Sequence, residues 1–332
     1  MLKMNWSYMF CKILKKTLIV ALLITKMSKS QNMNDFFSKL DRFLLSEETR
    51  KNAERFFVII AIISFIIHLG AILLIDVGIM ETPQNKSLII SPLSAIYTPF
   101  SFILIYEVYL LVFYLPKSMT DYIGKQYEII TLILIRKIFY DLSKLELTEN
   151  WFETQADLQF TYDIIGVLSL FVLIFLFYKL SVRYRNITGR ESVDLNEKTR
   201  RFIKIKTIMA NLLVPVVFLL AVYSFGNWIL DNTIKVKEVT QGIKDVNSIF
   251  FDDFFTVLIL TDVLLLLITF FQTDIFSRVI RNSGFIISTI MIKLSFSADG
   301  VINTILIVCA VGFGVLLLLI FNQYKKIEAR EA

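Results

Sequence analysis

Two acidic residues lie inside long apolar runs of this chain. Glu107 lies in FSFILIYEVYLLV (residues 100–112), and Asp262 lies in FTVLILTDVLLLL (residues 255–267). An ionised carboxylate is costly to bury, so in such surroundings it pairs with a base, binds a cation or takes up a proton. These two carboxylates are therefore the first candidates for ion or proton chemistry.

A third apolar run, residues 123–140, carries charges of both signs. If this run is a helix, successive residues are about 100° apart around its axis, and four residues then fall within about 80° of one another. They are Lys125, Glu128, Leu132 and Arg136, and they form one stripe along the helix. The matching face of residues 279–294 holds Asn282, Phe285, Thr289 and Lys293. We expect both faces to turn towards other helices, because a charge facing the centre of a bilayer costs about 2.5–3.5 kcal/mol.

The bases Arg136 and Lys293 need partners near the far ends of their runs. Asp163 is the first candidate for Arg136, and Asp252 or Asp253 are the others by their place in the sequence. On this prediction Lys137, about 100° round the helix from Arg136, matters little. Two alternatives stay open for these charges: structural pairs that hold helices together, or part of a path for an ion or proton. Arg136 reaching outward to water is the plainer interpretation.

The composition indicates a membrane protein. Hydrophobic residues make up 56% of the 332, with 30 phenylalanines and a mean hydropathy of +0.65. Soluble domains are about 45–50% apolar, and several runs here approach the roughly 20 residues that a bilayer requires. The net charge of +6 is concentrated in particular loops, so we assign it to orientation in the membrane and expect no nucleic-acid partner.

Hydropathy predicts six clear spans and two weaker ones. The clear spans are Phe57–Ile79, Leu93–Leu115, Ile164–Leu180, Ile208–Leu230, Phe254–Phe271 and Val301–Phe321, and the weaker ones are Ile123–Tyr140 and Val279–Leu294. Loop charges support all eight, because basic loops stay in the cytoplasm. Segment 179–206 has nine Lys and Arg residues, whereas 141–160 has only Lys144 beside five acids. The predicted fold is an all-α, multi-pass bundle of about eight transmembrane helices with both termini cytoplasmic, in the cell membrane.

The two halves of the chain resemble each other. Aligning 100–112 with 255–267, and 129–137 with 286–294, places Glu107 on Asp262 and Arg136 on Lys293. Polar columns carry this alignment, since apolar columns match by chance in any two membrane helices. A 4+4 tandem repeat follows, and an even number of spans per unit gives both units the same orientation. We expect the second and third helices of each unit to be neighbours.

The repeat divides the chain into a terminal segment, two membrane units and the parts between and after them. Residues 1–55 precede the first unit and include an amphipathic stretch around Phe36–Leu44 that suits a membrane interface; residues 1–32 are either a signal-like leader or an extension before a start at Met33. The first unit is 56–182, the basic cytoplasmic linker 183–206, the second unit 207–322 and the cytoplasmic tail 323–332.

Enzyme and cofactor signatures are missing from the sequence. Cys11 and Cys309 form no metal motif, and His68 is the only histidine. We read His68 as a hydrogen-bonded packing residue before a proton relay, and Pro215 as a kink. No loop between the spans is long enough for a soluble catalytic domain. We therefore expect no enzyme activity, no cofactor and no bound metal.

Two functions remain. The first is transport of an ion or small solute along a path lined by Glu107 and Asp262, with Lys125, Glu128, Arg136, Lys293 and Asp163 in the same polar network. The second is a scaffold or sensor subunit whose charges are structural pairs. Besides the lipid bilayer, the basic loop 179–206 suits anionic lipid or a protein partner, and the pattern is compatible with an oligomer. A cavity that reaches Glu107 or Asp262 would favour transport, and sealed pairs would favour a scaffold.

Overall fold

The computed structural model describes residues 43–78, 95, 97–142, 155–187, 203–216, 219, 246–270, 276–298 and 300–331. Within these ranges the chain is all-helical and contains no strand. The long helices are α3 (Glu47–Asp76), α4 (Tyr97–Tyr114), α5 (Met119–Leu142), α6 (Gln155–Ile187), α8 (Val246–Phe270), α9 (Phe276–Ser295) and α10 (Val301–Glu331). Residues 203–216 are also helical. The predicted all-α class is confirmed.

Local sequence fixes where several helices begin and end. Ser46 caps α3 by accepting a hydrogen bond from the Thr49 amide at 3.0 Å, and Ser118 receives one from Asp121 at 3.1 Å at the start of α5. Pro116, which has no amide hydrogen to donate, follows the end of α4. Gly78, with φ of 79°, follows α3 in a left-handed conformation that favours glycine.

Helices occupy the positions of the predicted spans, including both weaker ones, which are α5 and α9. By length and composition three segments can cross a membrane: Glu47–Ile75, Asp157–Val182 and Val301–Tyr324. Thr98–Tyr114 and Phe254–Ile268 are shorter apolar helices. The fifth predicted span, 208–230, is described only in part. The chain is thus a helical membrane protein, and the number of eight crossings and the side of each terminus stay predictions.

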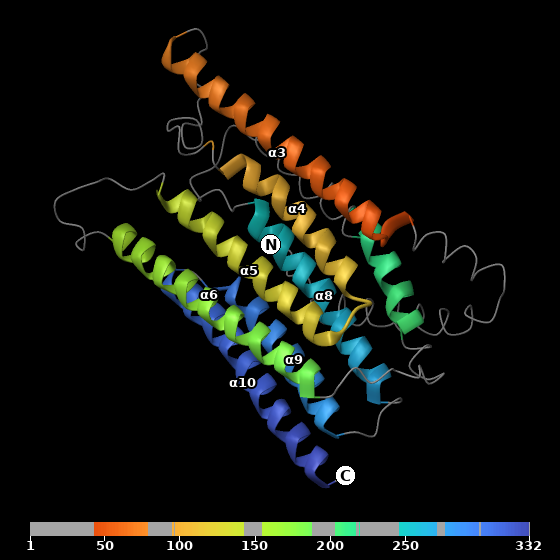
Figure 1. Cartoon of the computed structure of the whole chain (residues 1–332). Coiled ribbons are helices and arrows are strands. Elements are labelled where there is room, and N and C mark those ends of the chain that lie inside the picture. Colours follow the sequence, from red (N-terminus) through yellow and green to blue (C-terminus); the bar gives the residue numbers. More distant parts are fainter. Residues whose placement is uncertain are drawn as a thin grey trace, which may run out of the picture.

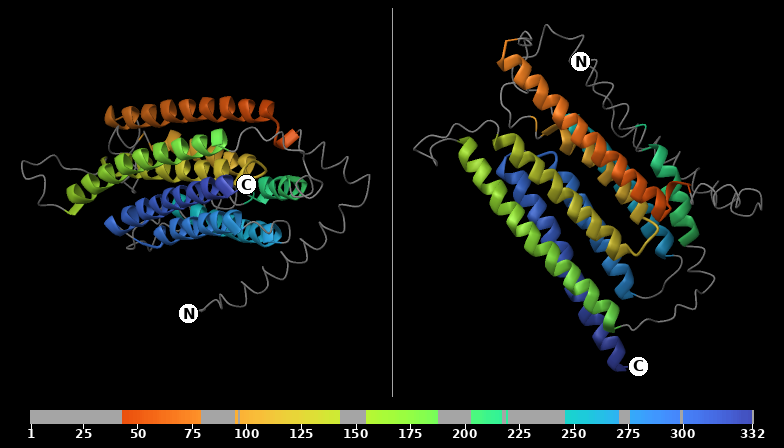
Figure 2. Two further views of the ribbon diagram at one scale, coloured as in Figure 1. Left: turned by 60° about the horizontal axis from the view of Figure 1, so that its bottom comes forward. Right: turned by 45° about the horizontal axis from the view of Figure 1, so that its top comes forward.

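The helices pack side by side with their long axes close to one direction (Figure 1). Each helix of the first half contacts the next, from α3 through α6, and α8, α9 and α10 do the same in the second half. The halves meet where α6 packs on α10 and α5 on α9. In the left view of Figure 2, α3, drawn in orange, lies at an edge of the bundle.

The predicted neighbours are neighbours: α4 contacts α5, and α8 contacts α9. The helices that join the halves, α5 with α9 and α6 with α10, are also equivalent to each other in the proposed alignment. This arrangement is what an axis along the membrane normal would produce. Superposition of the two pairs, and with it the repeat, stays a prediction.

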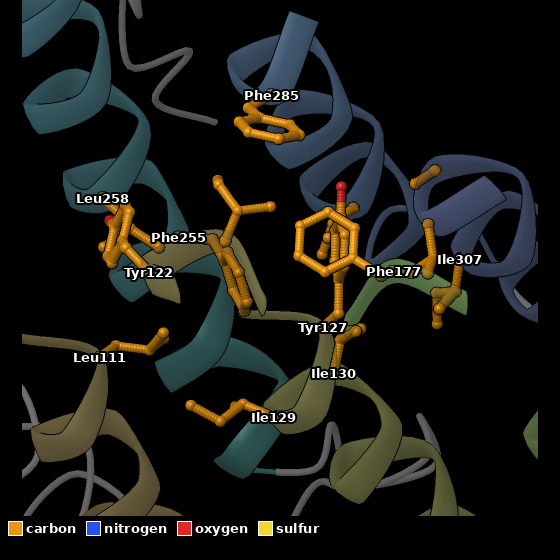
Figure 3. Packing of buried hydrophobic residues seen from close by; sticks show 14 of the residues in the cluster. Leu111, Tyr122, Tyr127, Ile129, Ile130, Phe177, Phe255, Leu258, Phe285 and Ile307 are labelled. Atoms are coloured by element: carbon orange, nitrogen blue, oxygen red, sulfur yellow. The ribbon is translucent and has the colours of Figure 1, made fainter. Parts of the chain in front are cut away.

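Apolar side chains cover the outside of the bundle as well as its core. On α3, Ile59, Ile62, Ile63, Ile66 and Ile67 are all more than half exposed. Such a continuous apolar face is unfavourable in water and favourable against lipid chains. Inside, aromatic side chains from α5, α6, α8 and α9 meet, with Tyr127, Phe177, Phe255 and Phe285 fully buried (Figure 3).

Candidate functional site

Asp262 on α8 is the centre of a buried polar cluster. Its side chain is 0% exposed. Gln126 on α5 donates from Nε2 to Asp262 Oδ2 at 3.4 Å, and Thr289 on α9 donates to Gln126 Oε1 at 2.7 Å. Three helices from the two halves therefore meet at this carboxylate.

Two polar atoms of this cluster have no hydrogen-bond partner among the described residues. They are Asp262 Oδ1, an acceptor, and the hydroxyl of Tyr122, which is a donor as well as an acceptor. Tyr122 is also 0% exposed and interacts electrostatically with Asp262. Buried polar atoms are normally satisfied by protein or water. A water molecule, a proton on the carboxylate or a bound cation would satisfy Asp262 Oδ1 and the Tyr122 hydroxyl.

A cavity of about 430 Å³ has Asp262 in its wall. The other described lining residues are Pro116, Lys117, Ser118 and Met119 between α4 and α5, Ile203 and Lys206, Leu265 and Leu266 on α8, and Arg281, Asn282 and Ile286 on α9. The volume is in the range of small-molecule sites, roughly 300–1,000 Å³. The cavity lies at the end of the bundle that the loop charges predict to be cytoplasmic.

Basic side chains line this cavity and are held in place by defined contacts. Lys206 donates to the backbone carbonyl of Lys117 at 2.8 Å. Lys117 forms an ion pair with Glu47 at 3.0 Å and lies over the Phe113 ring. Burial lowers the pKa of Lys206, which precedes the apolar run starting at Ile208, to about 8, and the nearby Asp262 carboxylate opposes that shift. Lys206 therefore stays mostly protonated at neutral pH.

Arg281 is the third base. It donates from Nε and Nη2 to Asn282 Oδ1 at 3.2 and 3.1 Å, and its guanidinium lies 4.5 Å from the centre of the Phe321 ring. A guanidinium group makes both kinds of contact well, the cation–π contact with a ring and hydrogen bonds from several N–H groups. They orient Arg281 at the cavity wall.

In the first half, Glu107 on α4 is only partly buried. Lys125 attracts its carboxylate electrostatically, and Glu128 repels it. Lys125 and Glu128 form an ion pair of their own at 2.6 Å, and the Tyr178 hydroxyl on α6 donates to the other oxygen of Glu128. The predicted stripe thus does bring Lys125 and Glu128 together, and Glu107 differs from Asp262 in lying outside the cavity described above.

At the other end of the bundle the predicted partner of Asp163 was wrong by one residue. Asp163 on α6, 0% exposed, pairs with Lys137 at 3.1 Å instead of with Arg136. It also accepts hydrogen bonds from Gln159 at 2.9 Å and from Thr304 on α10. Arg136 itself is buried, at 4% exposure. The base that meets Asp163 depends on how α5 and α6 pack against each other, and not on the helical stripe alone.

The remaining predicted residues differ in how far the structure describes and buries them. Thr289 and Phe285 of the second stripe are fully buried, Asn282 lines the cavity, and Lys293 is partly buried. The side chains of Asp252 and Asp253 lie outside what the structure describes. His68 bonds Thr98 on α4 through Nδ1 at 2.5 Å, which agrees with a packing role. In the described part of the chain no group of three His, Cys, Asp or Glu side chains is placed to hold a metal.

Sequence reasoning missed Tyr122, Gln126 and Arg281. Tyr122 and Gln126 are four residues apart, so they share a helical face next to the charged stripe. A polar glutamine inside an apolar run could have identified this face as functional. Arg281 lies about two turns before Thr289 on the same helix, so it could have been placed on the same face as Thr289. No signal in the sequence showed that α5 of one half would supply the partners of the acid in the other.

No family model, curated protein or solved structure matches the chain.

Proposed function

We propose that this membrane protein moves a small solute or ion across the bilayer, with Asp262 as the carboxylate that the transported species or a coupled proton reaches. The observation that carries this proposal is the cavity with Asp262 in its wall. Asp262 Oδ1 has no hydrogen-bond partner among the described residues and so can accept from a bound species. A carboxylate used only as structural glue has no need of such a space.

The opposite end of the bundle supports the same proposal. The ion pair of Lys137 with Asp163, together with Gln159 and Thr304, ties α5, α6 and α10 to one another. A bundle that is open at one end and tied at the other is the arrangement that alternating access requires of one conformation. We propose that these contacts form a closed gate.

A scaffold or sensor subunit is the alternative function, and one observation favours it. Lys125 pairs with Glu128, and Lys137 with Asp163, inside the bundle, as structural pairs do. The alternative leaves the cavity beside Asp262 without a role, which is why we rank it second.

We expect Asp262→Asn to abolish charge movement in proteoliposomes while leaving the folded yield close to that of the wild type. Asparagine keeps the shape and the acceptor for Gln126 but can neither carry a proton nor attract a cation. Currents on a solid-supported membrane would be recorded after a pH jump and after a sodium jump. Glu48→Gln, an exposed acid at the start of α3, is the matched control. Equal currents in wild-type, Asp262→Asn and protein-free liposomes would contradict transport of either ion.

The sidedness of the loops can be tested independently of transport. Cysteines at Ser192 and Thr148, both outside the described residues, should react with a membrane-impermeant maleimide from opposite faces of an intact membrane, in a background lacking Cys11 and Cys309. The reason is the excess of basic residues in 179–206 over 141–160. Reaction of both cysteines from one face would contradict eight crossings.

A further inference from the structure

The Asp262 carboxylate has one oxygen that accepts a hydrogen bond and one that is available. Thr289 donates to Gln126 Oε1 at 2.7 Å, which orients the Gln126 amide so that Nε2 donates to Asp262 Oδ2 at 3.4 Å. Oδ1 has no hydrogen-bond partner among the described residues, and the whole side chain is 0% exposed. Asp262 also lies in the cavity wall. A proton on this carboxyl group therefore belongs on Oδ1.

Tyr122 is suited to both protonation states of Asp262. Its hydroxyl is buried, interacts electrostatically with Asp262 and has no hydrogen-bond partner in the part of the chain that the structure describes. A hydroxyl can donate to an ionised carboxylate and can accept from a protonated one, whereas lysine and arginine can only donate. A carboxyl group that changes its protonation without leaving a buried atom unsatisfied needs a neighbour of this kind.

The charged groups around Asp262 favour a proton over a metal ion as its ligand. Lys206, in the same cavity wall, attracts the Asp262 carboxylate, and Arg281 lies close enough to repel Lys206. Lys117, also in the wall, forms an ion pair with Glu47. A metal ion would add a positive charge near Lys206 and would require several oxygen ligands. A proton requires only Oδ1.

We propose that Asp262 takes up and releases one proton at Oδ1, through the cavity, with the Tyr122 hydroxyl as the hydrogen-bond partner of both forms. A hydronium ion at the cavity end of the bundle supplies the proton and leaves as water, and release is the reverse step. Burial favours the protonated form and the charge of Lys206 favours the ionised one, so both forms are accessible. The inference names the ion of the proposed transport function and rests on that function for its biological role.

Infrared spectroscopy of the full chain in lipid films measures this protonation directly. A protonated carboxyl group has a carbonyl band that a carboxylate lacks. Spectra are recorded between about pH 5 and pH 9, where ordinary exposed aspartates stay mostly ionised. We expect the wild type to show a band that disappears as the pH rises, and Asp262→Asn to lack this band. Glu48→Gln, which removes an exposed acid on α3, should keep it.

Tyr122→Phe tests the hydroxyl, and it also serves if Asp262→Asn does not fold, because it keeps the carboxyl group. Loss of the hydroxyl costs the ionised form more than the protonated one, since hydrogen bonds to charged groups are the stronger ones. The pH at which the band has half its intensity should therefore rise by about one unit. Tyr127→Phe, which removes another buried hydroxyl on α5, should leave that pH unchanged.

Three results would overturn the proposal: identical bands in the wild type and Asp262→Asn, a band that does not change with pH, or the same half-intensity pH in Tyr122→Phe and the wild type. The spectra and the currents fail independently. A titrating Asp262 band without currents would support the proton site and contradict the proposed transport. Currents that Asp262→Asn abolishes, without such a band in the wild type, would reject the proton site and leave transport of another ion standing.

Discussion

Lys137→Met is expected to destabilise the bundle by about 2–3 kcal/mol. Removing one partner of a buried ion pair costs about 3–5 kcal/mol. We expect a cost at or below the lower limit of that range. Gln159 and Thr304 still donate to the Asp163 carboxylate after Lys137 is removed, and the Lys137 side chain is 32% exposed. Unfolding by sodium dodecyl sulfate, titrated into mixed micelles, measures the change. Lys51→Met, at an exposed site on α3, should have little effect.

The double variant separates a real pair from two independent contributions. Asp163→Asn combined with Lys137→Met removes both charges and leaves an amide that still accepts from Thr304. It should be more stable than the sum of the two single effects implies, by about 1 kcal/mol or more. Strict additivity would show that Lys137 and Asp163 are close but not energetically coupled.

The sequence predicted the helices that carry Lys137 and Asp163 but not the contact between the two residues. Hydropathy and loop charge located α5 and α9 although both contain bases, because the apolar length outweighs one or two charges near an end. Lys125 and Glu128, which the stripe placed on one face of a single helix, form an ion pair in the structure. The stripe predicted Arg136 as the partner of Asp163, whereas the structure pairs Asp163 with Lys137, about 100° round the same helix. The choice depends on the rotation of α6 against α5, which no local pattern contains.

The sequence predicted Asp262 as a candidate residue but did not predict its surroundings. Its position in an apolar run identified it as a candidate, and the structure places it in a cavity wall. Gln126, which donates to it, and Tyr122, which interacts with it electrostatically, come from a helix about 140 residues earlier in the chain. Lys206 and Arg281 come from two further segments. Contacts of this kind depend on which helices cross and at what depth, so the sequence located the acid but not the pocket around it.

Gly314→Ala is expected to destabilise the protein by about 1–3 kcal/mol, the usual cost of forcing extra volume into a packed core. A methyl group at Gly314 on α10 would overlap the Tyr127 hydroxyl oxygen and lie 2.7 Å from Tyr127 Cζ. Tyr127 cannot move aside easily. Its hydroxyl bonds Ser288 at 2.8 Å, and its ring packs edge-on against Phe177 with centroids 5.1 Å apart (Figure 3).

Gly312→Ala, two residues away on the same helix, is the matched control. A methyl group there would meet nothing closer than Leu173 Cδ1 at 3.9 Å, an ordinary contact. Since alanine also favours the helix over glycine by roughly 0.5–1 kcal/mol, this variant should be neutral or slightly stabilised. Tyr127→Phe should recover part of the loss in Gly314→Ala, because it removes the overlapping oxygen and leaves the ring. Similar stabilities of the two alanine variants would mean that α10 shifts away from α5 at little cost, and that the close approach at Gly314 does not fix how the two halves meet.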